Sequence, residues 1–319
     1  MKDLLSILDE FPKKQVVVIG DIMLDHYLEG KQTRMSPEAP IPIISVEKEW
    51  FTPGGAGNTA VNIASLGAKA SLIGRIGVDD NGKTTDNLLF GLGVDTKGIF
   101  GCGATTTKFR ILTDGKHFAR ADKDGNCSYV DEKFEDNLLG FFLSMMIVCN
   151  AVLISDYGKG LVTEGLARTI VQITREHKKM LIVDTKPKHF EWFKGCYCIK
   201  PNKVEAEEFT GVKIESISDA EKAGNIIKQK LEANVLLTLG SMGMILLEEE
   251  RTTHFTSNAK DVFDVTGAGD TVLAAFGLAL ASGANMRQAA DLANHAAAIV
   301  IGKHGTASVG LEELKNSLS

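Results

Sequence analysis

Residues 264–270 (Asp-Val-Thr-Gly-Ala-Gly-Asp) combine a glycine-rich turn with a carboxylate and run directly into an apolar segment, residues 271–281. A Gly-Ala-Gly turn that opens a helix exposes backbone N–H groups at the positive end of the helix dipole, where a phosphate can bind. Asp270 would repel that phosphate, but it is well placed to take a proton from a hydroxyl that attacks it. The pattern therefore indicates phosphoryl transfer. Tight packing of the glycines, with Asp264 or Thr266 as a helix cap, is the competing interpretation.

A second glycine cluster, residues 53–58 (Pro-Gly-Gly-Ala-Gly-Asn), precedes another apolar segment. Adjacent glycines let a ligand approach the backbone, and Asn58 can both donate to and accept from a sugar hydroxyl. The cluster also matches the G-x-G-x-x-A fingerprint of dinucleotide-binding folds, with Asp79 near the position of a ribose-binding acid. Residues 50–53 (Trp-Phe-Thr-Pro) precede it in place of a clean buried strand, which disfavours a dinucleotide site.

Two further polar turns are candidates for ligand contacts. Residues 201–205 (Pro-Asn-Lys-Val-Glu) and 238–243 (Thr-Leu-Gly-Ser-Met-Gly) each follow a predicted strand, at the end where open α/β sheets bind ligands. Taken singly, the first could be a helix cap and the second a hairpin. The sequence contains no G-x-x-x-x-G-K-[ST] motif, so a Walker-type P-loop is excluded and the turn at 267–270 must handle any phosphate.

The elements that must position these turns alternate between short apolar runs and helical patterns. The predicted strands are residues 16–20, 70–74, 151–155, 180–184, 197–200 and 235–239. The predicted helices are residues 58–66, 133–146, 163–177, 204–209, 220–231 and the segment after Asp270. This order predicts an α/β fold with a mainly parallel central sheet covered by helices on both faces.

Two regions replace helices with extended, half-exposed strands, at about residues 22–51 and 104–122. In the second, Lys108 and Arg110 alternate with apolar residues and so share one face, and Asp114-Gly115 is a strong hairpin turn. A small β-sheet that projects from the body, with basic residues on one side, would form a lid that excludes water from a transferable phosphoryl group. An ordinary edge hairpin with solvated charges is the alternative.

Composition narrows the function classes. The formal net charge is −6, from 35 basic and 41 acidic residues, which argues against a general nucleic-acid binder. No run of about 18 apolar residues could span a membrane, and residues 1–10 do not form a secretory signal, so a cytoplasmic location is expected. We expect the 319 residues to form one domain.

Taken together, the two glycine signatures resemble those of the ribokinase-like (PfkB-type) carbohydrate kinase family, and the resemblance covers nearly the whole chain. Within that family, residues 34–42 (Arg-Met-Ser-Pro-Glu-Ala-Pro-Ile-Pro), 155–160 (Ser-Asp-Tyr-Gly-Lys-Gly) and 184–186 (Asp-Thr-Lys) are most similar to members that phosphorylate a heptose phosphate. The resemblance implies a three-layer ribokinase-like fold with a small β-sheet lid. It also implies the use of ATP and Mg²⁺, with K⁺ as a further candidate ion.

The resemblance assigns roles to particular residues. Asp270 matches the catalytic base, and Gly267, Ala268 and Gly269 match the anion hole. The ATP-binding positions are Asn202, Lys203, Val204, Glu205, Thr238, Gly240, Gly243 and Asn294, with Glu205 near Mg²⁺ through water. The substrate-binding positions are Asp25, Gly54, Gly55, Asn58, Lys108, Arg110, Asp156 and Lys186. Asp264 and Thr266, facing residues 302–306, match a loop that holds a monovalent cation in many members.

The implied activity is transfer of the ATP γ-phosphate to O1 of D-glycero-D-manno-heptose 7-phosphate, in ADP-heptose synthesis for lipopolysaccharide. Another sugar or nucleoside kinase of this family, or a non-catalytic sugar-phosphate sensor on the same fold, are the alternatives. Many relatives continue into a nucleotidyltransferase domain, but the chain shows no H-x-G-H motif before Ser319, so adenylyl transfer is not expected. Exposed lid strands favour a homodimer in which the lids pair.

Overall fold

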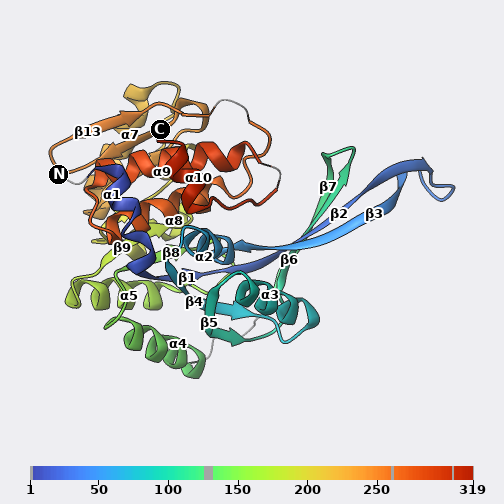
Figure 1. The fold of residues 1–319 in the computed structure, drawn as a ribbon, viewed down its shortest axis with the longest axis horizontal. Coiled ribbons are helices and arrows are strands. Elements are labelled where there is room, and N and C mark those ends of the chain that lie inside the picture. Colours follow the sequence, from blue (N-terminus) through green and yellow to red (C-terminus); the bar gives the residue numbers. More distant parts are fainter. Residues whose placement is uncertain (1–2, 126–131, 260–261, 304, 319) are drawn as a thin grey trace.

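Strand β1 (Gln15–Gly20) lies inside a nine-stranded sheet of the order β13-β12-β11-β10-β9-β8-β1-β4-β5. The computed structural model describes residues 3–125, 132–259, 262–303 and 305–318 (Figure 1). The other strands of this sheet are β4 (Lys69–Ile76), β5 (Val94–Gly101), β8 (Ala151–Ser155), β9 (Met180–Asp184), β10 (Cys198–Ile199), β11 (Asn234–Thr238), β12 (Met244–Leu247) and β13 (Thr252–Phe255). All pairings from β5 to β11 are parallel, and only those of β12 and β13 are antiparallel.

Helices cover both faces of the sheet (Figure 1). They are α1 (Leu4–Leu8), α2 (Ala56–Ser65), α3 (Asp80–Gly91), α4 (Glu132–Met145), α5 (Glu164–Glu176), α6 (Lys203–Thr210), α7 (Ile217–Leu231), α8 (Ala268–Ala281), α9 (Met286–Ile301) and α10 (Leu311–Asn316), with 3₁₀ turns at Phe11–Lys13, Pro187–Phe193 and Gly240–Met242. Because side chains alternate along a strand, Val16 and Val18 pack with the helices of one face, and Val17 and Ile19 pack with those of the other. The predicted α/β class is confirmed.

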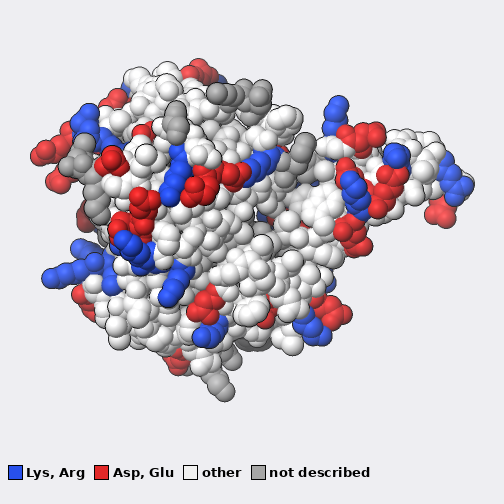
Figure 2. Space-filling model, in the orientation of Figure 1, with Lys and Arg blue, Asp and Glu red and all other residues white. Residues whose placement is uncertain are grey.

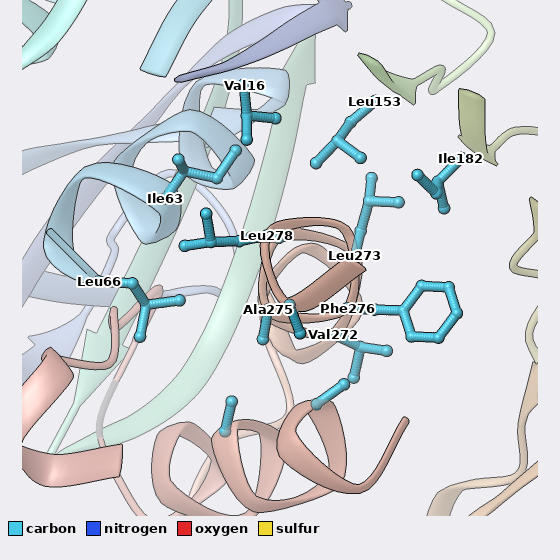
Figure 3. Packing of buried hydrophobic residues seen from close by; sticks show 14 of the residues in the cluster. Val16, Ile63, Leu66, Leu153, Ile182, Val272, Leu273, Ala275, Phe276 and Leu278 are labelled. Atoms are coloured by element: carbon cyan, nitrogen blue, oxygen red, sulfur yellow. The ribbon is translucent and has the colours of Figure 1, made fainter. Parts of the chain in front are cut away.

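Helix α8 is buried almost all the way round. Figure 3 shows Leu273 and Phe276 of α8 beside Leu153 and Ile182 of the sheet, while α2 packs alongside. Packing on all sides explains why this segment is apolar along its whole length rather than on one stripe. The first turn of α8, which carries Asp270, is therefore fixed to the core of the protein.

The second sheet is the small one that the sequence predicts, in the order β3-β2-β6-β7. Its strands are β2 (Ile22–Met35), β3 (Pro42–Gly55), β6 (Thr106–Thr113) and β7 (Lys116–Lys123). Asp114 and Gly115 join β6 to β7 with φ of 50° and 72°, as a type I′ hairpin requires. In Figure 1, β2 and β3 continue beyond β6 and β7 as a two-stranded ribbon that projects from the body. We refer to this sheet as the lid.

The sequence did not predict several elements of the structure, namely α1, α3, β5, β12, β13, α9 and α10. Asp79, a candidate ribose-binding acid in the dinucleotide interpretation, is the N-cap of α3, where its carboxylate accepts from the N–H of Gly82 at 2.9 Å. It also accepts from the N–H of Thr105 at 3.1 Å. The structure thus gives Asp79 a local structural role, which removes the support that it lent to a dinucleotide site.

Charged side chains of both signs are interspersed over the face shown in Figure 2, on the body and along the lid ribbon. Two pairs on the ribbon illustrate this, since Lys31 lies 3.0 Å from Glu47 and Lys48 lies 3.7 Å from Glu29. None of the helices in the described residues is long and apolar enough to cross a membrane.

Candidate active site

The predicted glycine turn does open a helix. Gly267 is the N-cap of α8 and has a φ of 79°, in the left-handed region that favours glycine. A Cβ atom on Gly267 would lie 2.7 Å from Nδ2 of Asn58, so a larger residue would displace that amide. A Cβ atom on Gly269 would lie 3.6 Å from Nζ of Lys200, which places a buried cation beside the turn. Backbone N–H groups and a nearby cation together suit an anion.

Asp270 lies in the first turn of α8 and is 3% exposed. Its Oδ2 accepts from the amide of Asn58 at 2.9 Å, and its Oδ1 accepts from the phenol of Tyr157 at 2.8 Å and the hydroxyl of Thr59 at 3.3 Å. Burial raises the pKa of Asp270 above its ordinary value, while these donors and Lys200 oppose the rise. The structure thus provides a buried carboxylate, held at both oxygens, beside the turn that is predicted to bind an anion.

Two lysines from different elements lie against Tyr157. Nζ of Lys108, on lid strand β6, and Nζ of Lys186, just after β9, are each 5.3 Å from the centroid of the Tyr157 ring. Burial lowers the pKa of Lys108, and Asp25 opposes this shift. The structure therefore brings two of the predicted substrate-binding cations to a residue that touches Asp270.

A second cluster of charges lies at the ends of β9 and β10. Nζ of Lys200 is 2.7 Å from Oδ2 of Asp184, and Nζ of Lys186 is 2.8 Å from Oε1 of Glu205. Burial raises the pKa of Asp184 to about 6, although Lys200 opposes the rise. Two carboxylates and two ammonium groups thus gather where parallel strands end, as expected for a ligand site in an open α/β sheet.

The turn at Asn202 begins helix α6 with a capping box. Asn202 accepts from the N–H of Glu205 at 2.9 Å, and Glu205 accepts from the N–H of Asn202 at 3.0 Å. Lys203 and Val204 form the first turn, with Val204 66% exposed. Helix capping alone explains the Asn-x-x-Glu spacing, and the ATP roles of these residues stay predictions.

The remaining ATP-side positions lie around the β11–β12 hairpin and α9. Thr238 ends β11, and Gly240 and Gly243 have φ of 61° and 82° in the turn that follows. A Cβ atom on Gly243 would lie 2.0 Å from the carbonyl oxygen of Phe255, so the hairpin itself requires this glycine. Asn294 donates its amide to the carbonyl of Thr256 at 2.7 Å. Their predicted contacts with ATP remain untested.

On the sugar side, the structure joins Asp25 to Arg110. Oδ1 of Asp25 accepts from Nε and Nη2 of Arg110 at 3.1 and 3.0 Å, and both residues are buried. Burial raises the pKa of Asp25, and Arg110 opposes the rise. Arg110 is therefore paired with Asp25, a predicted sugar-binding residue, and is not a charge exposed to solvent. A Cβ on Gly54 would lie 2.7 Å from Oδ2 of Asp25, which explains the glycine at this position of β3.

Asp156 is committed to protein donors. Its Oδ1 accepts from the N–H of Gly158 at 2.8 Å, and its Oδ2 contacts the hydroxyl of Thr185 and lies 2.6 Å from Nδ1 of His189. These contacts tie the loop after β8 to Thr185 and His189, so Asp156 supports that loop. Its predicted role as a substrate ligand is not tested by these contacts.

The predicted cation loop lies beside the segment that was expected to face it. Asp264 accepts from the N–H of Thr266 at 2.9 Å and of Gly305 at 3.2 Å. Nε2 of His117, on lid strand β7 beside the β6–β7 turn, lies 3.6 Å from Oδ2 of Asp264. This loop therefore contacts both the segment around Gly305 and the lid.

The residues of this site that were not assigned roles from the sequence include Tyr157, Thr59, Asp184 and Lys200. Tyr157 lies within residues 155–160, a segment that carried the family resemblance and in which only Asp156 was given a role. Lys200 could have been found from its position, because a lysine that ends an otherwise apolar buried strand needs an anionic partner. Thr59 offers no such signal, since its hydroxyl is one of many on helices.

Comparison with known proteins agrees with this geometry. The sequence model of a family described as pfkB family carbohydrate kinase matches residues 13–314. The bifunctional protein HldE of Desulfatibacillum aliphaticivorans is 40% identical over 314 residues, which cover 97% of this chain and 64% of that protein. HldE of Helicobacter pylori strain G27 is 38% identical over 304 residues, covering 94% and 65%. The chain thus spans slightly less than two thirds of the length of these relatives.

Solved structures with the same architecture include ribokinase of Arabidopsis thaliana complexed with ribose and ATP, with a TM-score of 0.77 and 20% identity over 96% of this chain and 99% of that one. Phosphofructokinase-2 of Escherichia coli in complex with potassium has a TM-score of 0.77 and 18% identity over 95% and 97%. At these identities the likeness shows the fold.

Proposed function

The chain belongs to the pfkB family of carbohydrate kinases, and we propose that it transfers the γ-phosphate of ATP to O1 of D-glycero-D-manno-heptose 7-phosphate. The product would be the 1,7-bisphosphate, and the step would serve the supply of ADP-heptose for lipopolysaccharide. The observation that carries this choice of acceptor is the placement of Lys108 and Lys186 against Tyr157, which touches the base. Cations at this position suit an acceptor that already bears a phosphate.

In the proposed reaction Asp270 accepts the proton of the attacking O1 hydroxyl. Its two oxygens already accept from Asn58, Thr59 and Tyr157, so the carboxylate is oriented before the acceptor arrives. As the new O–P bond forms and the bond to ADP breaks, negative charge develops on the transferring phosphoryl oxygens. The N–H groups of residues 267–269 and the ammonium of Lys200 would offset that charge.

The residues present fit a magnesium–ATP complex. Asp184 and Glu205 would supply oxygen ligands, although each is paired with a lysine. No group of three His, Cys, Asp or Glu side chains that could hold a metal ion occurs among the described residues. Mg²⁺ typically takes one or two carboxylates together with waters and substrate phosphates, so contact with Glu205 through water fits this arrangement. A bound Mg²⁺ would neutralise charge on the ATP phosphates.

Two further features extend the proposal. The loop of Asp264 and Thr266 would hold a monovalent cation such as K⁺, and activity in potassium chloride compared with tetramethylammonium chloride tests this.

The lid would pair with the lid of a second copy, because the ribbon exposes the apolar side chains of Met35, Ile41 and Val46. Sedimentation should then give a dimer mass, and a monomer at micromolar concentration would contradict it.

The bifunctional relatives are longer than this chain, and we propose the kinase step alone for residues 1–319, as one domain. Residues 1–319 of this chain do not contain the H-x-G-H motif of nucleotidyl transfer. Incubation with heptose 1-phosphate and ATP should accordingly release no pyrophosphate, and pyrophosphate release would overturn this part of the proposal.

A substrate panel tests the activity. Heptose 7-phosphate, the same heptose without its phosphate, ribose, fructose 6-phosphate and adenosine are compared by ADP formation. The bisphosphate product is identified by a second, anomeric phosphorus signal in ³¹P NMR. The dephosphorylated heptose is the matched control, because it differs only in the group that Lys108 and Lys186 are proposed to bind. A higher kcat/KM for any unphosphorylated acceptor than for heptose 7-phosphate would overturn the proposed substrate.

A further inference from the structure

We infer that Tyr157 is a positioning residue of the phosphotransfer, one that holds the carboxylate of Asp270 toward the acceptor and ties it to the lid. This inference rests on the proposed function, since it gives Tyr157 a part in the same site. Its phenol donates to Oδ1 of Asp270 at 2.8 Å, the shortest of the three hydrogen bonds described for that carboxylate.

Tyr157 is a point where parts of the site meet. Nζ of Lys108, on the lid, and Nζ of Lys186, just after β9, each lie 5.3 Å from the centroid of its ring. Gly55, a predicted sugar-binding residue, is close enough that a Cβ atom there would lie 3.5 Å from the ring. One side chain therefore touches the base, the glycine turn of the sugar side and both lysines proposed to bind the acceptor phosphate.

The backbone of Tyr157 is held by a buried carboxylate, that of Asp21. Asp21 follows β1 directly and is 3% exposed. Its Oδ2 accepts from the N–H groups of Tyr157 at 2.9 Å and Lys159 at 3.0 Å, and its Oδ1 accepts from the N–H of Leu161 at 3.3 Å. Three hydrogen bonds from one loop to one carboxylate fix the path of the chain on which Tyr157 sits.

Asp156 supports the same loop by accepting from the N–H of Gly158 at 2.8 Å. Gly158 and Gly160 have φ of 69° and 89°, so the loop adopts a conformation that other residues would resist. The loop is thus held by two buried carboxylates, and two of its glycines have a left-handed backbone. An ordinary surface loop between a strand and a helix does not need so many constraints. They make sense if the position of the Tyr157 phenol has to be precise.

The phenol also affects the charge of the base. The titratable groups that act on Asp270 are Tyr157, Lys200 and the nearby Asp184. Burial beside Asp270 raises the pKa of Tyr157 well above its ordinary value, so the phenol stays protonated and always donates. A donor to the ionised carboxylate lowers the pKa of Asp270. Loss of that donor should therefore raise the pH at which Asp270 loses its charge.

The test is Tyr157→Phe, which keeps the ring and its lysine contacts but removes the hydroxyl. We expect kcat to fall about tenfold or more, as for loss of a hydrogen bond to a charged group, with little change in KM for the sugar phosphate. The acid limb of kcat/KM should move to higher pH. Tyr197→Phe is the matched control, since Tyr197 precedes the amino end of β10, whereas the site lies where the strands end, and Tyr197 is 39% exposed. An unchanged kcat and acid limb in Tyr157→Phe would overturn the inference.

A double-mutant cycle tests the role of Asp21. If Asp21 acts by placing Tyr157, Asp21→Asn should lower kcat on its own but add little in a Tyr157→Phe background. Fully additive losses would mean that Asp21 supports the fold and not the phenol. Thermal unfolding of each variant identifies any that does not fold, and kcat is compared only among folded proteins.

Failure of the proposed acceptor can be distinguished from failure of this inference. The pKa of Asp270 can be followed in the protein without substrates by ¹³C NMR of labelled aspartate, with the signal assigned from Asp270→Asn. We expect the pKa of Asp270 to be higher in Tyr157→Phe than in the wild type and unchanged in Tyr197→Phe. That result would support the inference even if the substrate panel selected another sugar, and equal pKa values in all three proteins would overturn it.

Discussion

The amide of Asn58 donates to Oδ2 of Asp270 across 2.9 Å and so joins two glycine-rich turns that lie 212 residues apart in the chain. Asn58 belongs to the predicted sugar-binding cluster and Asp270 to the predicted anion-binding turn. The hydrogen bond fixes the carboxylate of Asp270, the proposed base, relative to the turn that carries Asn58.

Asp270→Asn should leave ATP binding nearly unchanged and lower kcat by about 10²- to 10⁴-fold, the usual contribution of a general base. Asparagine keeps the shape of the side chain but cannot accept the proton. Steady-state kinetics together with calorimetric ATP binding measures both effects. Asp136→Asn on the exposed surface of α4 is the control for loss of one charge, and near-normal turnover in Asp270→Asn would remove Asp270 from the mechanism.

Activity should decline toward acid pH at a higher pH than an ordinary aspartate would give. Burial raises the folded-state pKa of Asp270, so protonation begins earlier as the pH falls and the base is lost. Asn58→Ala removes a donor to the ionised form and should move the acid limb of kcat/KM higher still. A limb that stays in place in Asn58→Ala would instead belong to the phosphate of the acceptor.

Alanine at Gly267 and at Gly269 should have different effects. At Gly267 the left-handed φ and the 2.7 Å approach to Asn58 predict a loss of stability of about 1–2 kcal/mol and reduced turnover. At Gly269 the nearest atom, Nζ of Lys200, would be at 3.6 Å, so the fold should keep its stability. The added methyl would still obstruct a phosphate at the turn. Urea unfolding measures the stability of each variant, and steady-state kinetics measures its turnover. Full activity of Gly269→Ala would contradict the proposed anion hole.

Arg110→Met should destabilise the protein by about 3–5 kcal/mol, because it leaves Asp25 buried without its partner. The loss should be smaller at acid pH, where Asp25 can be protonated. Adding Asp25→Asn should recover part of the stability, since no unpaired charge then remains. Urea unfolding of the single and double variants measures this. Equal stability of Arg110→Met and the wild type at pH 7 would mean that the ion pair is not maintained in solution.

Lys108→Ala should raise KM for heptose 7-phosphate by about tenfold or more, the usual effect of losing a hydrogen bond to a charged group. Affinity for the dephosphorylated heptose should be unaffected. Lys48→Ala is the matched control, because Lys48 belongs to the same lid but has a side chain 74% exposed. If the two variants had the same KM, the phosphate contact would lie elsewhere.

Local patterns predicted much of the fold. The strands at 151–155 and 180–184 have the predicted boundaries, because each is a short buried run with polar residues at both ends. Helix α3 escaped prediction because its residues, such as Asp80, Asn81, Gly82 and Lys83, give little apolar periodicity. It forms because Asp79 caps it and Leu89 packs against the core.

The site could be predicted only in part, for a similar reason. The glycine turns and Asp270 carry their chemistry in their spacing. The contacts of Tyr157, Thr59 and Lys200 depend on which strand ends meet, and no local pattern contains that information. Arg110 shows the limit clearly, since alternation placed it on a basic face while its buried partner Asp25 lies 85 residues away.

The position of β1 in the sheet has a consequence for how the protein assembles during synthesis. β1 is made early but lies between β4 and β8, so it pairs with Ala151–Ser155 only after that strand has left the ribosome. Until then one edge of an apolar strand stays open. Pairings between distant segments slow folding and leave intermediates exposed to aggregation. We therefore expect refolding from urea to be slow and its yield to fall as the protein concentration rises.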